Sequence, residues 1–85
     1  MIEQDVIDAL QKAISDECGA NAHVERTTTA LEIPGWDSLA HVRIMMNLEA
    51  RLGTEIDIDK TYRAATIGDL INLIVSTHGE VDVDR

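Results

Sequence analysis

Aromatic residues are scarce in this chain, which has no phenylalanine and only Trp36 and Tyr62 as aromatic side chains. Apolar residues nevertheless make up 45% of its 85 positions, a share typical of a folded rather than a disordered chain. The hydrophobic core must therefore consist of Leu, Ile, Val and Met. Such an aliphatic core suits helices that pack on helices better than a sheet sandwich. A chain of this length has room for one domain with one modest core.

Residues that form disulfides or bind metals are also few. Cys18 is the single cysteine, so no intrachain disulfide can form, and we expect Cys18 to be a buried residue at a helix end. His23, His41 and His78 lack metal-ligand spacing, and we expect all three at the surface. The acidic stretch 55–59 lacks the glycine and the terminal glutamate of an EF-hand. We therefore expect no bound metal.

Basic residues are in the minority, because 7 Lys and Arg stand against 16 Asp and Glu, for a formal net charge of -9. Such a chain lacks the positive charge that binds nucleic acid, and it attracts partners with basic patches. No apolar run reaches the roughly 20 residues of a membrane helix. The acidic start MIEQDVIDAL also differs from a signal peptide. We expect a soluble, cytoplasmic monomer that binds no nucleic acid and inserts into no membrane.

Hydrophobic periodicity predicts a first helix over residues 2–18. The residues that recur every four positions are Ile2, Val6, Leu10 and Ile14, with Ile7 and Ala13 beside them. This spacing is typical of one face of an amphipathic helix, and Gly19 follows as its stop. From residue 20 to residue 36 the pattern breaks down into a long loop. Leu31 and Ile33 are its expected apolar anchors beneath the helices.

A second helix is predicted to begin at Asp37 or Ser38 and to end at Leu52, before Gly53. Its predicted buried face comprises Leu39, Val42, Met45, Met46, Leu48 (or Glu49, at the outer edge) and Leu52. An extended stretch over residues 55–59 and a short helical turn near Lys60–Ala64 follow.

The last predicted helix runs from Thr66, its N-cap, to Thr77, with Asp69 completing a capping-box pattern. Its inward residues are Ile67, Leu70, Ile71, Ile74 and Val75, and His78 and Gly79 close it. The predicted fold is all-α, a small four-helix bundle of three main helices and one short helix, with a long loop between the first two. We expect a domain over 1–79 and a flexible acidic tail over 80–85.

The tripeptide Asp37-Ser38-Leu39 is the strongest candidate for chemistry. A serine at the start of a helix is exposed, and its hydroxyl projects from the positive end of the helix dipole. A phosphodiester formed on that oxygen would be stabilised by the dipole and by free backbone N–H groups. The placement explains how Ser38 can hold a phosphate-linked group, without showing that it does.

The chain resembles the acyl carrier protein family, also called phosphopantetheine-binding domains. The resemblance extends from the first helical stripe through GWDSL to VRIMMNLEARLGTEIDI and TIGDLINLIV. It implies that Ser38, between Asp37 and Leu39, carries a covalent 4′-phosphopantetheine arm that holds acyl groups as thioesters. It also implies that the chain is not an enzyme. Its partners would be a phosphopantetheinyl transferase and the ligases, synthases or transferases that handle acyl or aminoacyl groups.

The sequence departs from carriers of general fatty acid biosynthesis, which usually have acidic residues where this chain has Ala40 and Arg43. Trp36 also differs from the small residue common before the motif. These departures indicate a specialised carrier, in polyketide, modified lipid or aminoacyl metabolism. The implied partner-binding face is the second helix, through Leu39, Val42, Arg43, Met46 and Glu49.

Other interpretations remain open at this stage. An aminoacyl or peptidyl carrier differs in cargo, and a helical adaptor would have no prosthetic group. A GDSL-type hydrolase is disfavoured because Trp36 replaces the glycine, although His41 lies one helical turn from Ser38. Met46 and the small residues Ala64 and Ala65 either fill the core or let a cleft open for an acyl chain. Trp36 is either a lid over the loop or a partner contact.

Overall fold

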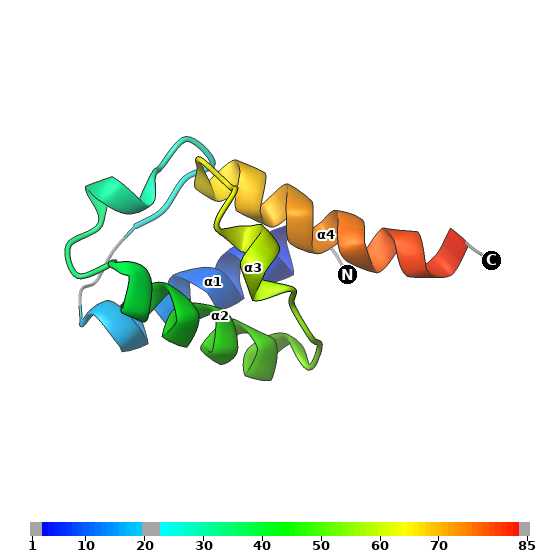
Figure 1. Cartoon of the computed structure of the whole chain (residues 1–85), viewed down its shortest axis with the longest axis horizontal. Helices are drawn as coiled ribbons and strands as arrows, with labels where there is room; N and C mark the ends of the chain where they lie inside the picture. The colour runs from blue at the N-terminus through cyan, green and yellow to red at the C-terminus, as the bar shows by residue number, and fades with distance from the viewer. Residues whose placement is uncertain (1–2, 20–22, 84–85) are drawn as a thin grey trace.

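The computed structural model describes residues 3–19 and 23–83, with side chains up to residue 76 within these ranges. Its elements are α1 (Glu3–Cys18), the short 3-10 helix η1 (Ala30–Glu32), α2 (Ser38–Leu52), α3 (Ile58–Thr61) and α4 (Ile67–Val83) (Figure 1). The described residues contain no strand. The predicted all-α bundle of three main helices and one short helix is confirmed, as is the long loop between the first two main helices.

Helix α1 forms the centre of the packing, because it contacts both α2 and α4. Its fully buried residues are Val6, Leu10, Ala13 and Ile14, as the periodicity predicts, while Ile2 lies outside the described residues. Gly19 adopts a left-handed φ of 68° and donates its backbone N–H to the carbonyl of Ser15, which ends the helix. The predicted stop at Gly19 is therefore confirmed.

Ion pairs reinforce the contact between α1 and α2 at the surface. The Arg51 guanidinium binds the Asp16 carboxylate at 2.5 Å, and Asn47 donates to the same carboxylate. These hydrogen bonds, from Arg51 first, lower the pKa of Asp16 below its ordinary value. Arg43 lies 3.5 Å from Glu17 on the same side. Two acidic groups of α1 are thus paired with two arginines of α2.

The buried face of α2 differs from the predicted one. The buried residues of this helix are Ala40, His41, Ile44, Met45 and Leu48. Met45 and Leu48 are confirmed, but Leu39 and Met46 are 66% and 58% exposed, so their predicted burial is wrong. The reason is that α2 carries more apolar residues than its contact with the other helices can cover. Val42 is only half-buried for the same reason.

The loop between α1 and α2 is anchored at Val24 and Ile33, which are 4% and 5% exposed. Leu31 is 98% exposed, so its predicted role as an anchor is wrong. It lies in the middle of η1, where the N–H of Ile33 donates to the carbonyl of Ala30. This turn buries Ile33 and leaves Leu31 in solvent.

The loop also caps the beginning of α4. The N–H of Ile67 donates to the carbonyl of Thr28, and that of Gly68 to the carbonyl of Arg26, both at 2.8 Å. These N–H groups belong to the first turn, where a helix has no carbonyl partners of its own. Thr66 accepts a hydrogen bond from the Asp69 N–H through its hydroxyl, as expected of an N-cap.

The ends of the last two helices need correction. Helix α3 begins at Ile58, which shortens the extended stretch expected over 55–59. Helix α4 continues to Val83, so the predicted end at Thr77 is wrong, and α4 extends beyond the other helices (Figure 1). A glycine inside a helix, such as Gly79, costs only about 1 kcal/mol, and no proline follows it. The domain boundary at residue 79 stays a prediction.

The core is aliphatic, as the composition requires. Its largest fully buried apolar side chains are Leu10, Ile14, Ile44, Met45, Leu48, Ile71 and Val6. None of the helices within the described residues combines the length and apolarity needed to cross a membrane.

The corrected face of α2 leads to a stability prediction. We expect Leu48→Ala to lower the free energy of unfolding by about 2–5 kcal/mol, because it removes a fully buried side chain and leaves a cavity. Met46→Ala, at an exposed position of the same helix, should change it by less than about 0.5 kcal/mol. Urea unfolding followed by circular dichroism measures both. Equal losses in the two variants would contradict this assignment of the buried face.

Candidate functional site

Ser38 is the first residue of α2, and its side chain is exposed. The preceding Asp37 is the N-cap, whose carboxylate accepts a hydrogen bond of 2.8 Å from the Ala40 N–H. The helical hydrogen bonds begin with the N–H of His41, which donates to the carbonyl of Asp37. The N–H groups of Ser38 and Leu39 precede this bond, so they lie outside the helical pattern at the positive end of the dipole.

The loop reaches Ser38 by passing close to the end of α1. Gly35 has a left-handed φ of 88°, and a Cβ atom there would lie 3.4 Å from the carbonyl oxygen of Cys18. Cys18 is half-buried rather than fully buried as predicted. Burial, followed by the nearby carboxylates of Asp37 and Glu17, raises the pKa of its thiol. Cys18 is therefore protonated at neutral pH and a poor nucleophile.

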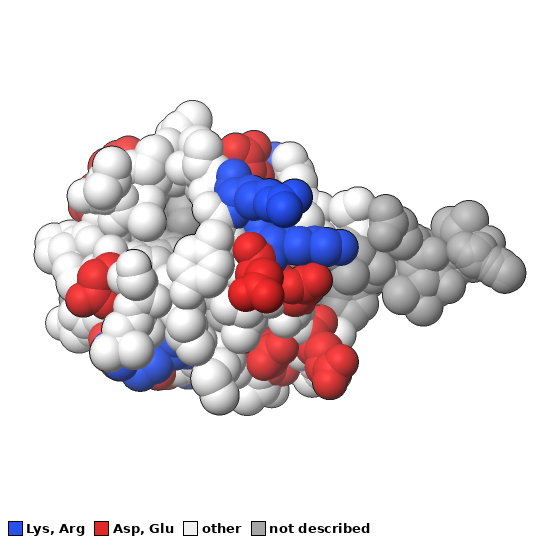
Figure 2. All heavy atoms as spheres, in the orientation of Figure 1, with Lys and Arg blue, Asp and Glu red and all other residues white. Residues whose placement is uncertain are grey.

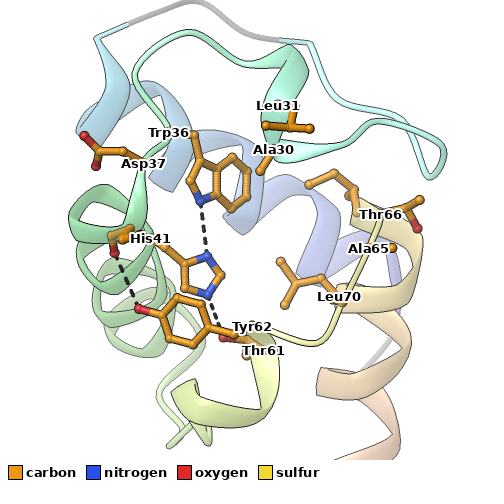
Figure 3. A pocket seen from close by; sticks show the side chains of 13 residues that line it. Ala30, Leu31, Trp36, Asp37, His41, Thr61, Tyr62, Ala65, Thr66 and Leu70 are labelled. Carbon is orange, nitrogen blue, oxygen red and sulfur yellow. Dashed lines mark hydrogen bonds between the residues drawn. The ribbon is translucent and has the colours of Figure 1, made fainter.

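His41 is buried, with 8% exposure, so its predicted surface position is wrong. Its ring lies between the rings of Trp36, at a centroid distance of 5.9 Å, and Tyr62, at 4.3 Å. The indole Nε1–H of Trp36 donates to Nδ1 of His41 at 3.1 Å, and Nε2 lies 2.7 Å from the hydroxyl of Thr61. We call these residues, Trp36, His41, Thr61 and Tyr62, the imidazole cluster. Figure 3 shows their side chains in a column from the loop to α3.

The hydrogen bonds of the cluster define the tautomer of His41. Its Nδ1 accepts from an indole N–H and must therefore be without a proton. The Thr61 hydroxyl donates its own proton to the carbonyl of Ile58, so it can only accept from Nε2. The neutral ring with its proton on Nε2 satisfies every partner. Burial lowers the pKa of His41 below the ordinary histidine value, which favours the same neutral form.

A groove of about 500 Å³ opens beside Ser38. Its lining residues are Ala30, Leu31, Trp36, Asp37, Ser38, His41, Thr61, Tyr62, Ala64, Ala65, Thr66, Ile67 and Leu70. The imidazole cluster forms one side, and η1 with the start of α4 forms the other (Figure 3). Of the three residues considered for a cleft, Ala64 and Ala65 line the groove, whereas Met46 does not. Trp36, half-buried in the wall, matches the predicted lid more closely than a free contact residue.

The residues predicted to bind partners lie on one face of α2, at positions 39, 42, 43, 46 and 49. Leu39, Met46 and Arg43 are exposed, and Val42 and Glu49 are half-buried. The Glu49 carboxylate accepts a hydrogen bond of 2.7 Å from the Ile56 N–H and so also supports the turn after α2. In Figure 2 the charged side chains gather over α3 and the loop before it, whereas the hollow between η1 and α2 is bordered mainly by uncharged side chains.

Thr61 and Tyr62, which the sequence pattern did not indicate, also line the groove beside Ser38. The hydroxyl of Tyr62 donates to the carbonyl of Ser38 at 3.4 Å, although the two residues are 24 positions apart. The sequence did contain one signal that could have indicated Tyr62. The chain has no phenylalanine, one tryptophan and one tyrosine, and both Trp36 and Tyr62 line this groove.

The histidines form no metal site in the part of the chain that the structure describes, where no three potential ligand residues come together. His23 is exposed, as predicted, and lies 3.6 Å from Glu25. The side chain of His78 lies outside the described residues.

Comparison with known proteins identifies the family. Residues 8–74 match the family model described as the phosphopantetheine attachment site. The match covers more than half of the chain, which therefore belongs to the phosphopantetheine-binding carrier domains. Such a domain receives 4′-phosphopantetheine covalently on a serine and works with a phosphopantetheinyl transferase and acyl-handling enzymes. A search of curated proteins finds no similar sequence.

The N-cap of α2 is open to a direct test. We expect Asp37→Ala to lower the free energy of unfolding by about 1 kcal/mol, because the Ala40 N–H loses its acceptor. Asp37→Asn keeps an acceptor oxygen and should recover most of this loss. Thermal unfolding of the three proteins at neutral pH measures the effect. A loss in Asp37→Asn as large as that in Asp37→Ala would show that charge, and not the cap, is responsible.

Proposed function

We propose that this protein is an acyl carrier protein whose Ser38 carries the 4′-phosphopantetheine arm. The observation that carries the proposal is the position of Ser38, exposed at the first residue of α2 and on the edge of a groove in which Asp37 is the only acidic lining residue. When bound, the arm supplies a thiol that holds acyl groups as thioesters. The residues present fit such a group, because an accessible hydroxyl, free backbone N–H groups and a groove meet at one point.

The other serines are poorer candidates. The chain contains Ser15, Ser38 and Ser76. Ser15 is half-buried in the last turns of α1, and its carbonyl accepts the bond that ends that helix. Ser76 is exposed but lies inside α4 and outside the 8–74 match. Only Ser38 combines exposure with a helix N-terminus.

The geometry also argues against a hydrolase. A serine nucleophile needs a base whose free nitrogen accepts its proton. Both ring nitrogens of His41 are occupied, Nδ1 by Trp36 and Nε2 by Thr61. His41 is therefore not available as a base for Ser38, and we propose that the chain itself catalyses no reaction.

Partner enzymes would dock on the face of α2 formed by Leu39, Val42, Arg43, Met46 and Glu49. This helix begins at the proposed attachment point, so a partner bound along it receives the arm at a fixed position. Its exposed Leu39 and Met46 offer apolar contact area at the centre of such an interface. The Arg43–Glu17 pair leaves this face less acidic than the net charge of -9 would suggest.

We propose a specialised pathway and an acyl cargo, with an aminoacyl cargo as the alternative. The support is the sequence around the site, where Ala40 and Arg43 occupy positions that are acidic in carriers of general fatty acid synthesis. Ala40 lies in the first turn of α2 and is buried, so an acidic side chain at this position would be buried as well. Loading assays with acyl and with amino acid substrates distinguish the two cargoes.

Attachment is tested by intact-mass measurement after incubation with coenzyme A and a broad-specificity phosphopantetheinyl transferase. We expect the wild type and Ser76→Ala to gain the mass of one phosphopantetheine, and Ser38→Ala to gain none. A control carrier shows that the transferase is active. Modification of Ser38→Ala would refute the assignment, and no modification of the wild type even with a cognate transferase would favour the adaptor.

The docking face is tested with two matched leucines. Leu39 lies on α2 and Leu31 on η1, and both are exposed. We expect Leu39→Ala to raise the KM of the transferase about fivefold, the effect of truncating one apolar anchor of an interface. Leu31→Ala should change KM less than twofold if α2 is the main contact, roughly the effect of a peripheral residue. A larger effect of Leu31→Ala would place docking on the loop instead.

A further inference from the structure

His41 links three segments that surround Ser38. Trp36, two residues before Ser38, donates to one ring nitrogen, and Thr61 in α3 accepts from the other. Tyr62, whose ring packs at a tilt against the imidazole, donates to the carbonyl of Ser38. The loop, the start of α2 and α3 are therefore connected through a single side chain that does not itself contact the hydroxyl of Ser38.

We propose that His41 is a positioning residue for Ser38: its neutral ring holds Trp36 and α3 in place, and its protonation releases Trp36 and slows the modification of Ser38. This inference rests on the proposed attachment of phosphopantetheine at Ser38. It adds a regulatory property to that site, namely a dependence on pH that originates in the carrier and not in the transferase.

Protonation has a defined consequence in this cluster. A proton taken up from water would bind to Nδ1, because Nε2 already carries one. The new Nδ1–H would then point at the indole N–H of Trp36, which lies 3.1 Å away. Two donors cannot share a hydrogen bond, and the indole nitrogen has no acceptor function to offer. The contact between Trp36 and His41 must therefore break, whereas the bond from Nε2 to Thr61 can persist.

The surroundings of His41 offer little compensation for a positive charge. The other titratable groups that line the groove are Asp37, whose carboxylate is bound to the Ala40 N–H, and Tyr62, whose hydroxyl donates to Ser38. Helix α4 faces the groove with apolar residues such as Leu70. The cationic residues near α3, Lys60 and Arg63, are exposed. A charged imidazole would thus be buried without a partner.

The direction of the pH effect follows from linkage. We call the arrangement in which Trp36 donates to His41 the closed state, and the arrangement without this bond the released state. Burial lowers the pKa of His41 in the closed state, so the unfolded or released state binds the proton more readily. The stabilisation from the neutral ring is fully present above the ordinary histidine pKa of about 6.5. It is lost as the pH falls below that value and through the lowered pKa of the closed state.

The first experiment follows the closed state without any transferase. Trp36 is the only tryptophan, so the indole fluorescence of the apo protein comes from this residue and responds to changes in its contact with His41. We expect its emission to change with a midpoint below about pH 6.5, the ordinary histidine value. His41→Gln should abolish the change, and His23→Gln, at an exposed histidine, should leave it intact. The same titration in His41→Gln as in the wild type would overturn the proposal.

The second experiment measures modification by competition. Wild type and His41→Gln, which differ in mass, are mixed in equal amounts with coenzyme A and the transferase, and the ratio of products is read at each pH. The pH dependence of the enzyme cancels in this ratio. We expect the ratio of modified wild type to modified His41→Gln to be about fivefold lower at a pH below the midpoint of the fluorescence change than at neutral pH, the effect of one lost hydrogen bond. A ratio independent of pH would refute the inference while leaving attachment at Ser38 established.

A second variant keeps the test valid if His41→Gln does not fold. Trp36→Phe retains a ring but removes the opposing N–H, so protonation of Nδ1 becomes less costly. We expect the midpoint of the His41 ring signals in proton NMR to rise relative to the wild type. An unchanged midpoint would show that Trp36 does not resist protonation. If no protein is modified at any pH, the proposed function fails, whereas the fluorescence and NMR results still judge the role of His41.

Discussion

The neutral imidazole of His41 uses both of its nitrogens inside the fold, one for Trp36 and one for Thr61. Each bond holds a segment that has little stability of its own. Helix α3 has four residues, far fewer than an isolated helix needs in water, and Trp36 belongs to an irregular loop. Their positions therefore depend on α2, which is itself anchored in the core. One wall of the groove beside Ser38 exists because this contact is made.

Large exposed apolar side chains gather in the groove beside Ser38 and on α2, which begins at Ser38. The large apolar side chains exposed among the described residues are Leu31, Leu39, Met46 and Tyr62. Two of them, Leu31 and Tyr62, line the groove, and the other two lie on α2. Elsewhere, charges are arranged in pairs such as Arg51 with Asp16. An apolar centre within a charged rim is the usual composition of an interface, and here it surrounds the proposed attachment point.

Local patterns predicted the helices well and their contacts less well. The stripe of α1, the stop at Gly19, the cap at Asp37 and the position of Ser38 all follow from residues within a few positions of each other. The burial of His41 depends on Thr61, 20 residues away, which periodicity cannot reveal. The exposure of Leu31 depends on the η1 turn, which leaves Ile33 to face the core instead.

The groove and the core have different packing, and this difference matters for function. Ile44, Leu48 and Ile71 are fully buried, so a group that entered between them would have to displace side chains from a close-packed interior. The groove instead has alanines on its far wall, at positions 64 and 65 among others, and these leave space unfilled. A group attached at Ser38 can therefore cover apolar surface there without disturbing the core. The rings of Trp36 and Tyr62, which both pack against His41, form the wall of the groove opposite these alanines.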